Sequence, residues 1–74
     1  MPQFTPMHNV KIKHYGDVGK GLGYLERLEP GKVEKLLKDA RNGGAEINEY
    51  IDGARRKYNI KHTGHDEYSL EWAA

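Results

Sequence analysis

The chain has 74 residues, of which 12 are lysine or arginine and 11 are aspartate or glutamate, so its formal net charge is +1. A protein that binds nucleic acid through phosphate contacts usually carries a clear basic excess, whereas an acidic mimic of DNA carries the opposite. The near balance excludes such a mimic and requires any nucleic-acid binder to segregate its charges on the surface. The absence of cysteine excludes disulfides, thiolate metal sites and a cysteine nucleophile.

Length and hydropathy predict one small domain. Hydrophobic residues make up 36% of the chain, which allows only a small core. No apolar run is long enough to span a bilayer, and the first residues lack the basic and apolar regions of a signal peptide. We therefore expect a cytoplasmic protein that uses neither a membrane nor a cofactor. We expect an irregular N-terminal arm over residues 1–7 and a single α+β domain over residues 8–74.

The first half of the chain predicts one strand followed by a glycine-rich loop. Apolar and polar residues alternate from Asn9 to Tyr15, as they do in a half-buried strand. Gly16–Gly23 holds four glycines in eight residues and predicts a mobile loop. Leucines at 22, 25 and 28 favour a short helix, although residues 24–29 are also compatible with a strand.

The second half predicts two helices and a hairpin. Pro30 suits the first turn of a helix, and apolar spacing of three and four residues continues to Arg41, where Asn42-Gly43-Gly44 ends it. The same spacing recurs over residues 45–58 and predicts a second helix. Alternation in the tail predicts a hairpin over 59–63 and 67–73 that turns at Gly64.

Together these elements predict an α+β fold with a small three-stranded antiparallel sheet and two main helices packed on one face. The expected order is strand, short helix, helix, helix, strand, strand. The expected core comprises Leu36, Leu37, Ile47, Ile51, Leu70 and Trp72.

The helix, glycine turn, helix and hairpin over Pro30–Trp72 resemble a winged helix-turn-helix module. The resemblance implies that the second helix enters the major groove of DNA and that the hairpin contacts the backbone. A further basic surface follows from the strands, where lysines would emerge opposite the apolar side chains and could hold a single strand of nucleic acid. The nucleic-acid-binding candidates are Lys11, Lys13, Asn48, Arg55, Arg56 and Lys61. Acidic residues in the predicted second helix oppose this hypothesis.

Histidines offer a third hypothesis. His62, His65 and Asp66 cluster at the predicted turn, but their spacing matches no zinc pattern, so we expect no metal site. Histidine with lysine or tyrosine can also serve a small metal-free ribonuclease. No spacing in the chain requires this chemistry, so we predict no catalytic residue.

The sequence hypothesis that we rank first is a non-enzymatic interaction module that binds a larger protein or nucleoprotein complex as an inhibitor or adaptor. A winged-helix-like nucleic-acid-binding regulator and a small ribonuclease are the alternatives. The balanced charge and the glycine-rich loop favour the first hypothesis. The expected partner-binding residues are Tyr15, Lys20, Leu22, Tyr24, Arg55 and Arg56. The identity of the partner and the oligomeric state stay open.

Overall fold

A mixed five-stranded sheet forms the centre of the protein in a computed structural model that describes residues 3–73. The strands are β1 (Gln3–Met7), β2 (Val10–His14), β3 (Ala45–Ile51), β4 (Ala54–Gly64) and β5 (Glu67–Trp72). Helices α1 (Gly19–Arg27) and α2 (Pro30–Arg41) lie between β2 and β3 in the chain. Neither of these helices, the two found in the described residues, is long and apolar enough to cross a bilayer.

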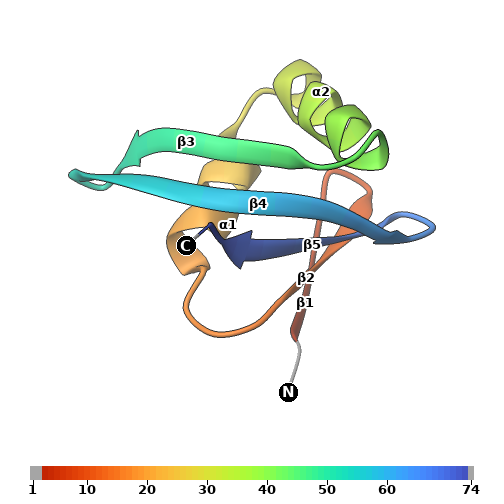
Figure 1. Ribbon diagram of the computed structural model, residues 1–74, viewed down its shortest axis with the longest axis horizontal. Coiled ribbons are helices and arrows are strands. Elements are labelled where there is room, and N and C mark those ends of the chain that lie inside the picture. The colour runs from red at the N-terminus through yellow and green to blue at the C-terminus, as the bar shows by residue number, and fades with distance from the viewer. Residues whose placement is uncertain (1–2, 74) are drawn as a thin grey trace.

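The order of strands across the sheet is β1-β2-β5-β4-β3, so the N-terminal hairpin lies beside the C-terminal strand (Figure 1). β2 and β5 pair in parallel, with Ile12 opposite Tyr68, while the other neighbouring strands pair antiparallel. The prediction of a three-stranded antiparallel sheet was therefore wrong, although the α+β class is correct. The expected strand near Asn9–Tyr15 does lie next to the tail hairpin, but it runs parallel to its neighbour.

The largest correction concerns residues 45–58, which form the β3–β4 hairpin instead of a second helix. Asp52 and Gly53 connect the strands with φ angles of 50° and 80°. Two consecutive positive φ values are typical of a type I′ turn, whose twist matches that of the flanking strands. The resemblance to a winged helix-turn-helix module is therefore wrong, because residues 45–58 form strands where the recognition helix was expected.

Two other predictions also change in the N-terminal part. Residues 3–7, expected to be an irregular arm, form β1, which a turn at His8 and Asn9 connects to β2; both turn residues have positive φ. Residues 1–2 of that arm lie outside the described residues. The glycine-rich segment is a loop only up to Val18, because α1 begins at Gly19 and includes Gly21 and Gly23.

Both helices cover the same face of the sheet, and the core lies between this face and the helices. Tyr58, Ile60, Tyr68 and Leu70 project from the sheet towards the helices and are almost fully buried. The helices contribute Leu25, Val33, Leu37 and Ala40, and Val18 is buried just before α1. The expected core residues Leu37, Ile47, Ile51 and Leu70 are indeed buried, whereas Leu36 lies at the rim.

Trp72, which we expected inside the core, lies at its border and is 47% exposed. Its ring centroid is 4.7 Å from that of Tyr58, and its Nε1 donates a 2.8 Å hydrogen bond to the backbone oxygen of Asp17. Trp72 therefore closes one end of the core and holds the loop before α1 against the last strand.

Helix α1 approaches the sheet closely at Gly21. A Cβ atom at this position would come within 2.9 Å of the Cζ atom of Tyr58, whose side chain is fully buried. Only a residue without a side chain allows the helix to approach the ring this closely. Gly21 thus sets the distance between α1 and β4.

We predict that Gly21→Ala lowers the free energy of unfolding by about 1–3 kcal/mol, because overpacking forces the buried ring or the helix to move. Gly23→Ala is the matched control, since its Cβ would meet only the Arg27 side chain at 3.9 Å. The free energy of unfolding of the control should rise by up to about 1 kcal/mol, because alanine has a higher helix propensity than glycine. Urea unfolding measures both variants, and equal stability of the two would contradict the packing described here.

Candidate functional site: the open face of the sheet

The sheet face opposite the helices carries a continuous set of polar and aromatic side chains, which we call the open face. Strand alternation places its members on the side away from Ile12, Ile60 and Leu70. Most of these side chains are exposed to solvent. The members are Phe4, Pro6, Lys11, Lys13, Tyr15, Glu46, Asn48, Tyr50, Arg55, Lys57, Asn59, Lys61, Glu67, Ser69 and Glu71.

One row of the open face crosses four strands. In order across the sheet, the row runs Phe4 (β1), Lys13 (β2), Ser69 (β5) and Lys61 (β4), and each residue is the register partner of the next. Ser69 is only 6% exposed although no helix covers it. The small serine therefore lies low between two lysines. The row therefore has one lysine on each side of the low-lying Ser69, and it ends at the Phe4 ring.

The adjoining rows alternate in charge. Next to the lysine row, Glu71 pairs with Asn59, and Asn59 pairs with Glu46 on β3. Beyond the glutamates, Lys57 pairs with Asn48 and Arg55 pairs with Tyr50. The ion pairs of the described residues, Lys20–Asp52 and His65–Asp66, both lie outside the open face. The surface is thus a set of stripes of alternating sign.

Of the four large hydrophobic residues that are exposed within residues 3–73, three belong to this face: Phe4 (50% exposed), Tyr15 (52%) and Tyr50 (70%). The Lys13 Nζ atom lies 5.8 Å from the centroid of the Tyr15 ring, within the range of a cation–π contact. Tyr15 follows the last residue of β2, so this contact places its ring beside the lysine row. The aromatic rings lie at both edges of the sheet, with charged stripes between them.

The structure separates the residues that the sequence predicted to bind a protein partner. Tyr15 and Arg55 lie on the open face, and Arg55 donates a 3.2 Å hydrogen bond to Asn48. Arg56 lies on the helix-covered side and donates to the backbone oxygen of Ile51 at 2.9 Å. The remaining three, Lys20, Leu22 and Tyr24, lie in α1.

The candidate nucleic-acid-binding residues, in contrast, lie mostly together. Five of the six lie on the open face, and only Arg56 is on the other side. The predicted exit of Lys11, Lys13 and Lys61 opposite the apolar residues is therefore correct. Sequence reasoning missed Phe4 and Tyr50, because Phe4 was assigned to the irregular arm over residues 1–7 and Tyr50 to the helix predicted over residues 45–58. The Asp52-Gly53 pair was the signal that would have placed Tyr50 on a strand.

Helix α1 is joined to the β3–β4 turn by charge. The Lys20 Nζ atom lies 2.6 Å from Asp52 Oδ2, and both side chains are about half exposed. The hydrogen bond from Lys20, and then its positive charge, lower the pKa of Asp52 below its ordinary value of 3.8. Nearby, burial and then the Glu49 carboxylate raise the pKa of Tyr24. Lys20 therefore ties α1 to the β3–β4 turn, while Leu22 and Tyr24 are partly buried against the core.

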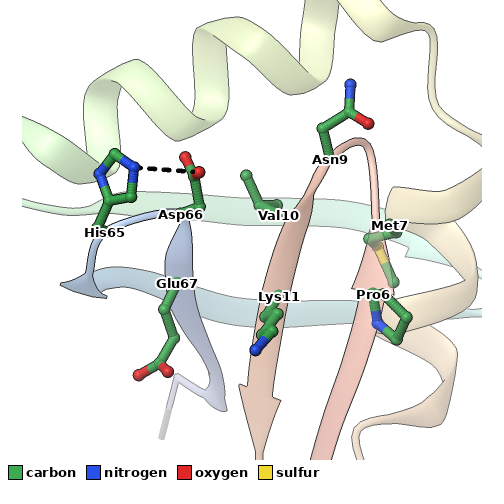
Figure 2. Close-up of a pocket in the computed structure, with 8 residues that line it drawn as sticks. All are labelled: Pro6, Met7, Asn9, Val10, Lys11, His65, Asp66 and Glu67. Atoms are coloured by element: carbon green, nitrogen blue, oxygen red, sulfur yellow. Dashed lines mark ion pairs between the residues drawn. The ribbon is translucent and has the colours of Figure 1, made fainter.

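A hollow of about 560 Å³ lies at the end of the open face, between the β1–β2 and β4–β5 turns (Figure 2). In Figure 2 the side chains of Lys11 and Glu67 extend to one side of the strands, while Val10 and Asp66 extend to the other. His65 lies 3.4 Å from Asp66 and is almost fully exposed. Lys11 lies here with two carboxylates, those of Asp66 and Glu67, so the hollow offers no basic cluster for an anion.

The four histidines lie apart. His8 bonds the backbone oxygen of Leu25 at 2.9 Å, buried His14 bonds Thr5 at 2.9 Å, and His62 packs on Tyr68. Within residues 3–73, no three histidine or acidic side chains come together as a metal site would require. Proton transfer in a metal-free ribonuclease needs two suitably placed groups, and the described histidines do not converge on one hollow.

Comparison of the chain with models of protein families, with curated proteins and with solved structures finds no match. Function is therefore inferred from the geometry of the open face and of the groups around it.

We predict that Lys20→Gln moves the pKa of Asp52 back up towards its ordinary value, because the mutation removes the partner that stabilises the carboxylate. NMR titration of the Asp52 carboxyl carbon measures the shift. The pair stabilises the fold above pH 3.8, where the unfolded carboxyl is ionised, and this contribution is lost as the pH falls through the lower folded pKa. An unchanged Asp52 titration in the variant would contradict the contact.

Proposed function

We propose that this protein is a non-enzymatic interaction module that binds a larger protein through the open face, as an inhibitor or adaptor does. The observation that carries the proposal is that Phe4, Tyr15 and Tyr50 are all exposed on this one face, at its edges, with rows of acidic and basic residues between them. Protein interfaces are enriched in aromatic residues and surround them with polar groups. The helix-covered face, in contrast, is used by the core.

Charge on the open face favours a protein over nucleic acid. Five basic residues (Lys11, Lys13, Arg55, Lys57 and Lys61) share the face with Glu46, Glu67 and Glu71. A phosphate backbone that crossed the stripes would meet carboxylates between the basic rows, which repel it. A protein surface with stripes of the opposite order would instead match every row.

The partner that fits this face has a defined chemistry. It offers acidic groups to the Lys13–Lys61 row and to Arg55 and Lys57, and basic groups to Glu46 and Glu71. It also offers apolar pockets near the edges of the sheet, where Phe4 and Tyr50 are exposed. Paired strands hold the backbone of nearly all these groups, so binding at the open face orders mainly their exposed side chains.

Affinity capture from lysate with matched variants tests the proposal. The open-face variant carries Lys13→Glu and Lys61→Glu, and the control carries Lys32→Glu and Lys35→Glu on the exposed side of α2, with the same change of net charge. We expect a protein that wild type and control retain after nuclease treatment, and that the open-face variant loses by at least about tenfold, as the loss of charged contacts at an interface predicts.

A second pair of substitutions, Phe4→Ser with Tyr50→Ser, should cause the same loss while circular dichroism shows an intact fold. Retention of the same protein by the open-face variants would contradict the proposal. Capture that disappears with nuclease would instead assign the open face to nucleic acid.

A further inference from the structure

A second candidate site lies where α2 ends beside the last part of β4, at the border between the open face, which holds Lys61, and the helix-covered face, which holds His62. A hollow of about 300 Å³ is lined there by Ala40, Arg41, Gly43, Gly44, Lys61 and His62. These residues come from three elements: the end of α2, the turn before β3, and the last part of β4. Three of the six have basic side chains, and none is acidic.

Tyr68 holds two of the basic groups in place. The Nη1 atom of Arg41 donates a 2.7 Å hydrogen bond to the Tyr68 hydroxyl, and Tyr68 is only 2% exposed. His62 is the direct cross-strand partner of Tyr68, and the two ring centroids are 5.0 Å apart. A buried phenol therefore orients a guanidinium at its hydroxyl and an imidazole at its ring. This hydrogen bond fixes the orientation of the Arg41 guanidinium and uses only one of its N–H groups, so the others can donate to a ligand.

The turn leaves room for a ligand beside these groups. Gly43 and Gly44 both have φ of 124°, which side-chain-bearing residues rarely adopt, and a Cβ at Gly43 would meet open space. The Gly44 N–H is already bonded to the Asp39 backbone oxygen at 3.1 Å, which fixes the turn. Glu46 lines the adjoining hollow on the other side of the same turn, not this one.

We propose that this hollow binds a dianionic phosphate group, held by Arg41, Lys61 and His62. An arginine that is fixed by a buried partner matches the oxygens of a phosphate through two parallel hydrogen bonds, and lysine adds a second positive charge. The site is independent of the protein-binding function proposed for the open face, apart from Lys61, which borders both. It takes free phosphate or the terminal phosphate of a small molecule.

NMR titration with inorganic phosphate at constant ionic strength tests the proposal, with sodium chloride as the reference salt. We expect saturable shifts of the Gly43, Gly44 and His62 signals. Arg41→Gln should weaken binding about ten- to a hundredfold, as the loss of a charged hydrogen-bond donor predicts. Lys35→Gln, on the same helix and with the same charge change, should bind as wild type does.

Tyr68→Phe tests the positioning role of the phenol. The ring that packs on His62 remains, but the hydroxyl that orients Arg41 is lost, so phosphate affinity should fall several-fold while the Arg41 charge is kept. Lys61→Gln, at an exposed strand position, provides a further variant if Arg41→Gln does not fold. It should weaken phosphate binding but leave the partly buried Arg41–Tyr68 hydrogen bond intact.

A parallel titration with a nucleoside monophosphate distinguishes the source of the phosphate. Tighter binding of the nucleotide with the same shifts would assign a phosphorylated small molecule, and equal binding would assign the phosphate group alone. The absence of saturable shifts with either ligand, or equal weakening by Lys35→Gln, would overturn the proposal. The Phe4 and Tyr50 variant leaves Arg41, Lys61 and His62 unchanged, and the Arg41 and Tyr68 variants leave the open face unchanged, so these variants judge the two proposals separately.

Discussion

The parallel pairing of β2 with β5 is the contact on which the rest of the structure depends. It joins the N-terminal hairpin to the three C-terminal strands, and without it the chain would have two separate small sheets. Parallel neighbours need a long connection between them, which here includes both helices and two further strands. The pairing also aligns Lys13 with Ser69, and thereby completes the row that Lys61 and Phe4 extend across the open face.

The two faces of the sheet follow from this register. The strands place their buried apolar residues towards the helices, where Gly21 allows α1 to pack directly on the Tyr58 ring, while Phe4 and Tyr50 lie on the open face. A domain of this size has a small core, and both helices are needed to cover it. The opposite face keeps its polar residues in solvent, and the small, buried Ser69 leaves space between the two lysines. Stability and the proposed binding function thus use different faces of the same strands.

Some elements were predictable from local signals. Pro30 at the start and the glycines after Arg41 gave the bounds of α2, and the alternation around Leu70 gave β5 and its hairpin partner. The prediction of a helix over residues 45–58 was wrong because Ile47 and Ile51 are four residues apart. That spacing suits one face of a helix and one face of a strand equally well. The Asp52-Gly53 turn decided between them, since it joins two strands tightly and would cost stability inside a helix.

The candidate sites depend on contacts that no local pattern encodes. Alternation in β2 and β4 predicted that Lys11, Lys13 and Lys61 share one face, but the parallel register that aligns them with Ser69 joins positions far apart in the chain. Arg41, His62 and Tyr68 come from three different elements, and only the packing of α2 on β4 and β5 brings them together. Phe4 and Tyr50 gained their significance in the same way, because their strands were recognised only in the folded chain.

The most direct measurement is the set of interstrand backbone NOEs between β2 and β5 in the isotopically labelled protein. The account predicts contacts between residues 11–14 and 67–70 in rising order along both strands, together with slow exchange of the amides that bridge them. A falling order would show an antiparallel pair, and an absence of contacts would show separate sheets. Either result would remove the Lys13–Ser69–Lys61 row and contradict the open face as described.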